Sequence, residues 1–205
     1  MANDTITAAT ALRIIPAGEA PFADVESVFG TRGDPAGCWC QWYKLGRADF
    51  QAAGRDVLRE RLAAQLSEPG PGPGLLAYDG DTPVGWCAVE PRPALPRLAH
   101  SPVGSASPDD DFDDATVWSV SCFVIPRAFR RRGVAGALAR AAADYARDQG
   151  ARVLEAYAVD PAARDGKPPA ADLFPGTVSM YLAAGFHEVS RPKPHRAVMQ
   201  LEMRD

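Results

Sequence analysis

The segment "TVWSVSCFVIPRAFRRRGVAGALARAAADYA", residues 116–146, constrains the fold more than any other part of the chain. Its first ten residues are rich in β-branched and aromatic side chains, which predicts a strand over 116–125. Apolar residues then recur every three or four positions, which predicts a helix over 133–150 that buries one face. The chain therefore contains a strand and a helix joined by a short turn that carries three consecutive arginines.

That turn has the features of an anion site. The first turn of a helix leaves about four backbone amides unpaired, and the helix dipole adds partial positive charge there. Gly133 lets the backbone approach a ligand closely, and small residues keep the next turn open. The sequence therefore predicts a pyrophosphate site, and the alternative is a solvated basic turn that only begins a helix. The predicted site consists of Arg130, Arg131, Arg132, Gly133, Val134, Ala135 and Gly136.

Two common phosphate-binding motifs do not fit this turn. A P-loop requires G-x-x-x-x-G-K-[ST], and the sequence has no such run. A dinucleotide-binding turn requires G-x-G-x-x-G, whereas only Gly133 and Gly136 are present here and an arginine stands where the first glycine is needed. The pattern that does fit is R-x-x-G-x-A, over residues 130–135.

The rest of the chain predicts a mixed α/β sheet with helices on both faces, in one domain over residues 1–205. The expected order is β-α-α-β-β-β-α-β-α-β-β. The connection over 91–114 is long and rich in proline, which indicates a loop that touches substrate or is partly mobile. The other expected strands cover 11–17, 75–79, 84–91, 152–160, 186–191 and 197–203, and the other helices cover 21–30, 49–67 and 177–185.

A second motif, Tyr181-Leu-Ala-Ala-Gly185-Phe186, follows the first after one helix and one strand. With the turn over 130–135, it resembles the GNAT superfamily of acyl-coenzyme A N-acyltransferases, and the resemblance covers residues 75–203. It implies a mostly antiparallel central sheet and acetyl-CoA as the acyl donor, with direct transfer of the acetyl group to a primary amine. A non-catalytic sensor that binds acyl-CoA is the alternative.

The resemblance also implies individual roles. It makes Tyr181 the general acid for the departing thiolate, with packing beside Phe186 as the alternative. The backbone of Phe123, Val124 and Ile125 would pair with the pantetheine arm. Many relatives carry a glutamate base on the fourth or fifth strand, which suggests Glu155, while a structural ion pair is the alternative for that residue. Glu90 is a weaker candidate for the base.

The chain departs from the family pattern at two positions. The spacing from Pro126 to Gly133 is one residue longer than the commonest form, so the amides that bind phosphate can shift by one. Phe174 stands where relatives often have an asparagine that contacts the cofactor. Both departures concern the cofactor contacts.

Tryptophans are the residues we expect at the acceptor site, because the region around "GCWCQWY" flanks the cleft of the fold that the chain resembles. We expect Trp39, Trp42 and Trp118 to contact substrate, with simple packing as the alternative. Cys38 and Cys40 lack the second ligand pair that a zinc site needs, so no metal is expected. Cys122 lies in a strand among apolar residues and is expected to be a buried, inert thiol.

Composition limits the partners. The net charge of −4 gives no reason to expect nucleic-acid binding. The first twenty residues lack the pattern of a signal peptide and no run of apolar residues suits a membrane span, so a cytoplasmic protein with reduced thiols is expected. The acceptor is expected to be a small-molecule amine or a protein lysine or N-terminal amine. The strand over 197–203 can pair across a homodimer. Acidic loop residues weakly suggest a cationic acceptor, namely 109–111, 113–114, Asp160 and Asp165.

Overall fold

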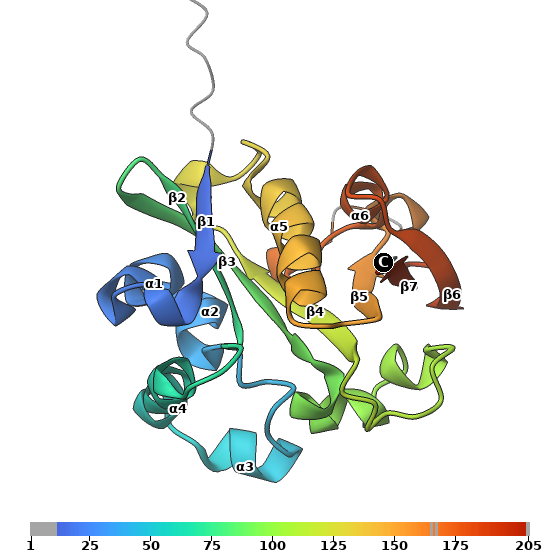
Figure 1. Ribbon diagram of the computed structural model, residues 1–205, viewed down its shortest axis with the longest axis horizontal. Coiled ribbons are helices and arrows are strands. Elements are labelled where there is room, and N and C mark those ends of the chain that lie inside the picture. Colours follow the sequence, from blue (N-terminus) through green and yellow to red (C-terminus); the bar gives the residue numbers. More distant parts are fainter. Residues whose placement is uncertain (1–11, 165, 167, 204–205) are drawn as a thin grey trace, which may run out of the picture.

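Seven strands form one sheet in the order β1-β2-β3-β4-β5-β7-β6 in the computed structural model, which describes residues 12–164, 166 and 168–203 (Figure 1). All neighbouring strands are antiparallel except β4 and β5, which are parallel. The predicted mixed, mostly antiparallel sheet is therefore confirmed. The strands are β1 (Arg13–Pro16), β2 (Gly74–Asp79), β3 (Thr82–Pro91), β4 (Val117–Val124), β5 (Val153–Val159), β6 (His187–Lys193) and β7 (Arg196–Glu202).

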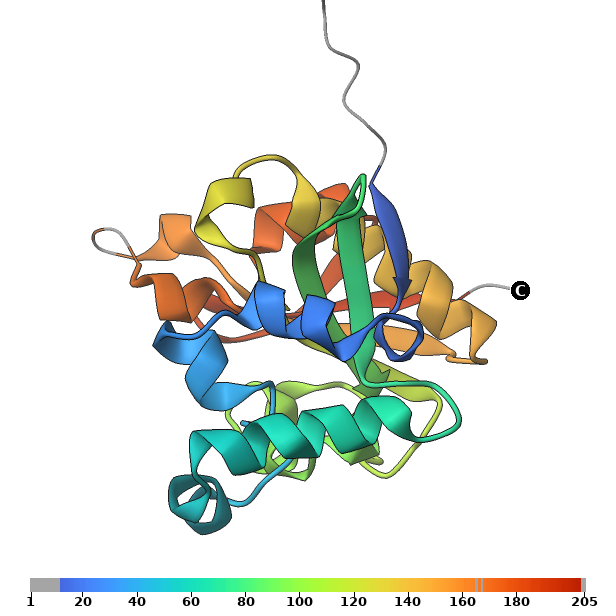
Figure 2. The same cartoon turned by 90° about the vertical axis from the view of Figure 1, so that its left-hand side faces the viewer.

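Helices cover both faces of the sheet, as predicted. One apolar cluster joins α5 and α6 to the strands, and a second joins α1 and α4 to the opposite face. Figures 1 and 2 show α1 and α4 together on one side, with α5 on the other. The helices are α1 (Phe22–Phe29), α2 (Gly33–Cys38), α3 (Arg47–Ala52), α4 (Arg55–Ser67), α5 (Val134–Asp148) and α6 (Val178–Ala183).

The first third of the chain holds two more helices than the sequence predicts. Helix α2 lies in a region expected to be irregular. The helix expected over 49–67 is two helices, because Ala53 and Gly54 take extended backbone conformations between α3 and α4. The start of the strand predicted over 11–17 lies outside the described residues, and β1 begins at Arg13.

The connection over 91–114 is packed against the sheet. Leu95, Leu98 and Val103 form a buried cluster with Tyr157 of β5 and Val198 of β7. This segment is therefore folded onto the core through Leu95, Leu98 and Val103. Its turns are 3-10 helices over Arg92–Ala94, Pro96–His100 and Gly104–Ala106.

Strands β4 and β5 separate in the middle of the sheet. They pair only through Val117–Val120 and Val153–Ala156. Beyond that point the Phe123 amide donates instead to the carbonyl oxygen of Phe174 (2.7 Å). A bulge at Ser121 interrupts the pairing of β4 with β3, since Ala88 lies opposite Cys122 and Val89 lies opposite Val120. The gap between the strands opens the sheet where the candidate site lies.

Within the described residues, every helix is too short or too polar to cross a membrane.

Candidate active site

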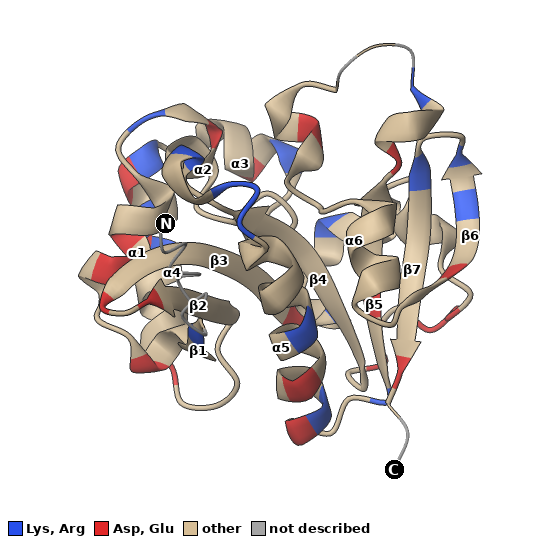
Figure 3. Ribbon diagram, turned by 90° about the horizontal axis from the view of Figure 1, so that it is seen from above, with Lys and Arg blue, Asp and Glu red and all other residues tan. Residues whose placement is uncertain are grey.

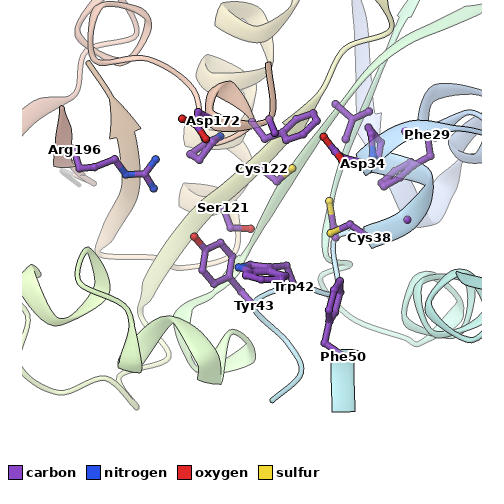
Figure 4. Close-up of a pocket in the computed structure, with 18 residues that line it drawn as sticks. Phe29, Asp34, Cys38, Trp42, Tyr43, Phe50, Ser121, Cys122, Asp172 and Arg196 are labelled. Atoms are coloured by element: carbon purple, nitrogen blue, oxygen red, sulfur yellow. The ribbon is translucent and has the colours of Figure 1, made fainter. Parts of the chain in front are cut away.

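Two cavities flank the gap between β4 and β5. The smaller, about 450 Å³, lies at the amino end of α5, and the larger, about 630 Å³, is lined by α2 and the segment that follows it. Phe174 lines both cavities. We call them the donor cavity and the acceptor cavity. Figure 4 shows the acceptor cavity, with Cys122 and Ser121 of β4 between Arg196 on one side and Asp34 on the other.

The turn before α5 directs backbone amides toward the donor cavity. Arg131 (φ 62°) and Gly133 (φ 80°) both adopt left-handed backbone conformations. The first amide of the helix to find a partner is that of Ala137, which donates to the Gly133 carbonyl oxygen (3.0 Å). Within the described residues, none of the amides of 131–136 donates a hydrogen bond. Unpaired amides on left-handed turns at a helix start form a concave anion site, so the turn fits a pyrophosphate.

The three arginines of the turn differ in their contacts. Arg130 Nε donates to the carbonyl oxygen of Ile125 (2.9 Å). Both Arg130 and Arg131 line the donor cavity. The guanidinium of Arg132 lies 5.6 Å from the centre of the Phe129 ring and is absent from the cavity wall. Figure 3 shows this basic turn at the start of α5, whose other end carries acidic residues.

The end of β4 offers a partly occupied edge. The Phe123 amide and the Ile125 carbonyl already have partners on the side away from β3. Because backbone direction alternates along a strand, the Phe123 carbonyl and the Ile125 amide also face the gap. Val124 lies opposite Trp86 of β3, so its backbone faces β3 and its side chain lines the acceptor cavity. Two backbone groups therefore remain for an extended ligand, at Phe123 and Ile125.

Tyr181 lines neither cavity but lies directly behind residues that do, namely Phe123 and Pro175. Its side chain is fully buried beside Phe123 and Phe186, and its hydroxyl donates to the Pro175 carbonyl oxygen (2.8 Å). Burial raises the pKa of Tyr181 well above its usual range. The phenol is therefore protonated at neutral pH and is a weaker acid than an exposed tyrosine.

Glu155 is enclosed in a polar network. Its carboxylate accepts hydrogen bonds from Tyr157 (2.6 Å), Ser107 (2.6 Å) and Gln200 (2.9 Å). The buried guanidinium of Arg92 lies 3.9 Å away, and Glu155 lines neither the donor cavity nor the acceptor cavity. This geometry supports the structural role that was the alternative for Glu155.

Glu90 is also buried and lines neither cavity. Its carboxylate accepts from Lys44 Nζ at 2.5 Å. Burial raises the pKa of Glu90, although the lysine opposes that shift. The pair joins β3 to the segment after α2, so its position is structural.

The three tryptophans have different surroundings. Trp42 is 45 % exposed, packs on Phe50 and lines the acceptor cavity. Trp39 is buried behind that wall and stacks on Phe29, with ring centres 4.9 Å apart. Trp118 lies in the core under α5, against Tyr145, so we correct its assignment from substrate contact to core packing.

Cysteines line the acceptor cavity more fully than the sequence suggests. Cys122 is half-buried and faces the cavity with Cys38 and Cys40, which corrects the expectation that it is buried. Burial raises the pKa of Cys38 to about 11, and a hydrogen bond with Cys122, together with burial, raises that of Cys40 well above its usual range. Cys38 and Cys40 are therefore neutral thiols and poor nucleophiles.

Three of the acidic loop residues that suggested a cationic acceptor are engaged elsewhere. Asp109 and Asp114 form ion pairs with Arg152, and Asp160 pairs with Arg191. None of these three aspartates lines the acceptor cavity, and Asp165 lies outside the described residues. Other residues line the acceptor cavity, including Ser121, Cys122 and Arg196, and no motif in the sequence identifies them.

A known family accounts for this combination of turn and split sheet. The model of the family described as Acetyltransferase (GNAT) family matches residues 39–165, which is more than half of the chain. The chain belongs to the GNAT acetyltransferase family. No curated protein is similar enough in sequence to count as a relative.

Solved GNAT structures share the fold at low identity. The yncA protein from Salmonella typhimurium, solved with acetyl-CoA, is 14 % identical, with 95 % of each chain covered and a TM-score of 0.54. The paia N-acetyltransferase from Thermoplasma acidophilum, in complex with coenzyme A, is 11 % identical, covering 94 % of this chain and 99 % of its own, with a TM-score of 0.52. Ribosomal-protein-alanine N-acetyltransferase from Brucella melitensis is 15 % identical, covering 94 % of this chain and 99 % of its own, with a TM-score of 0.53.

Proposed function

We propose that this GNAT protein is an N-acetyltransferase that moves an acetyl group from acetyl-CoA directly to a primary amine. The observation that carries the proposal is the row of unpaired amides over 131–136 beside the gap between β4 and β5. These amides, with Arg130 and Arg131, would hold the pyrophosphate. The Phe123 carbonyl and the Ile125 amide would hold the pantetheine arm, as an added strand would be held.

When bound, acetyl-CoA supplies a thioester: the amine nitrogen bonds to the acetyl carbon as the carbon–sulfur bond breaks, the nitrogen loses a proton and the sulfur gains one. Tyr181 is the proposed donor of the proton to sulfur, because the family motif gives it that role and its hydroxyl is bonded to Pro175, which lines the acceptor cavity. The amine would enter through the acceptor cavity as the free base, after it has released one proton to water. The second proton, which the nitrogen loses as the amide forms, would pass through water to the phenolate that Tyr181 becomes.

Replacing Arg130, Arg131 and Arg132 together by alanine is expected to weaken acetyl-CoA binding by at least about tenfold, or about 1.4 kcal/mol. The reason is the loss of positive charge beside the amides. Calorimetric titration measures the affinity, and thiol release with a panel of amines measures turnover. Absence of acetyl-CoA binding to the wild type would overturn the proposal. Binding without thiol release on any amine would favour the sensor.

The Tyr181→Phe variant is expected to lower kcat by about tenfold or more, with an unchanged Kd for acetyl-CoA. General acids contribute on the order of 10²–10⁴, and a thiolate is a fair leaving group, so the loss lies at or below the lower end of that range. The variant also loses the bond to Pro175, which is worth about 1 kcal/mol of stability. Steady-state kinetics and thermal unfolding separate the two effects. A normal kcat with a reduced Tm would limit Tyr181 to packing.

A further inference from the structure

Arg196 is a cation at the acceptor cavity that has no ion-pair partner among the residues the structure describes. It is the first residue of β7, is half-buried, and lines both the acceptor cavity and an adjoining cavity of about 260 Å³. Its side chain forms no ion pair and donates no hydrogen bond within the described part of the chain. Figure 4 shows the guanidinium extended toward the middle of the cavity.

Nearby arginines are engaged in a way that Arg196 is not. Arg164 pairs with Asp172, and Arg191 pairs with both Asp160 and Glu188. Arg97 lies 3.7 Å from the centre of the Trp42 ring and donates to the Trp42 carbonyl oxygen. Of the two aspartates that share the cavity wall with Arg196, Asp172 is already paired with Arg164, and Asp34 lies on the opposite side of the cavity.

The charge around Arg196 is positive. Lys193 lines the adjoining cavity with it, as do Arg164 and Asp172, which pair with each other, and Figure 3 shows the basic residues at the facing ends of β6 and β7. Burial, together with Arg164, Arg196 and Lys193, lowers the pKa of His195, so this imidazole adds no positive charge at neutral pH. An anion that enters from the acceptor cavity therefore meets a preformed positive field.

The wall opposite Arg196 is mostly aromatic, and Asp34 also lies on it. Phe29, Trp42 and Phe50 line the side away from Arg196. Between the two ends lie Ser121 and Cys122, at the bulge where β4 leaves β5. A ligand that spans the cavity would place an anionic group at Arg196 and an apolar body on the rings, with the strand gap between them.

We infer that the acceptor is a small amine that also carries a carboxylate or similar oxyanion, bound by Arg196, with an apolar side group held by Phe29, Trp42 and Phe50. An apolar amino acid has this chemistry. A guanidinium binds a carboxylate through two parallel hydrogen bonds, which gives selectivity as well as affinity. This inference rests on the proposed acetyl transfer.

Two pairs of compounds that differ only by the carboxylate test the inference: phenylalanine with 2-phenylethylamine, and leucine with 3-methylbutylamine. Each is titrated calorimetrically into protein saturated with CoA. The acid of at least one pair is expected to bind at least about tenfold more tightly than its amine in the wild type. Arg196→Met is expected to abolish that preference, and Arg196→Lys is expected to keep part of it. Arg61→Met removes one exposed positive charge from α4 and is expected to keep the full preference.

Equal binding of acid and amine, or no binding of either acid, would overturn the inference. So would a preference that survives Arg196→Met. A loss of acetyl-CoA affinity in Arg196→Met would overturn it as well, since Arg196 would then serve the donor. Failure of the proposed function has a separate signature, namely no acetyl-CoA binding by the wild type. If the wild type binds acetyl-CoA but acetylates the acids and the amines equally, the inference about the acceptor is wrong and the proposed function still stands.

Discussion

The Gly136→Glu variant is expected to bind acetyl-CoA at least about 100-fold more weakly than the wild type, or about 2.7 kcal/mol, while it folds normally. Gly136 lies in the first turn of α5, among the unpaired amides. A Cβ there meets only the Arg140 side chain, at 3.8 Å. The new carboxylate would lie where the pyrophosphate is proposed to bind, and would repel it. Calorimetric titration measures the loss.

The fold itself is expected to gain from this change. Glutamate is a better helix former than glycine by about 0.5–1 kcal/mol. A negative charge in the first turn also interacts favourably with the helix dipole and stabilises the helix. Thermal unfolding is therefore expected to show an equal or higher Tm. Gly136→Gln is the matched control, because it has the same size without the charge and is expected to lose less affinity. Unchanged affinity in Gly136→Glu would contradict the proposed phosphate site.

The second large effect is expected in Arg92→Met, which is predicted to lower the free energy of unfolding by about 3–5 kcal/mol. Removing one partner of a buried ion pair leaves the other charge uncompensated. Glu155 is fully buried, and Arg92 is the arginine that faces it. Arg92 also donates to Ser107 (3.0 Å) and to the Asp111 carbonyl oxygen, so it fastens the connection over 91–114 to the sheet. Urea unfolding at neutral pH measures the change.

A double-mutant cycle completes this experiment. Adding Glu155→Gln to Arg92→Met removes the buried charge and is expected to restore part of the lost stability. Glu155→Gln alone is expected to reduce stability while the folded protein keeps its kcat, because the carboxylate lines none of the described cavities. A folded Glu155→Gln variant with a kcat reduced on the order of 100-fold would restore Glu155 as the base.

The sequence by itself determined the parts of this protein that depend on neighbours along the chain. The basic turn predicts an anion site because Gly133 and the start of α5 lie within a few residues of each other, and the structure places unpaired amides there. The long apolar strand at 116–125 and the amphipathic helix that follows are likewise local patterns. The two motifs, at 130–135 and 181–186, were sufficient to predict the family.

Tertiary structure decided which side chains meet at the acceptor site. Simple alternation along β4 puts Trp118 and Cys122 on the same face. The bulge at Ser121 reverses that alternation, because one extra residue turns every later side chain to the other face. Trp118 therefore packs under α5, whereas Cys122 reaches the cavity.

The ends of the acceptor cavity come from segments far apart in the sequence. Trp42 follows α2, Ser121 lies in β4 and Arg196 begins β7. The enclosure of Glu155 likewise depends on the connection over 91–114 folding back onto β5. Residues so far apart in the sequence form no recognisable motif, because the distance between their side chains is set by how the sheet and its loops pack. The turn that is proposed to hold the donor is local, whereas the site that selects the acceptor exists only in the folded chain.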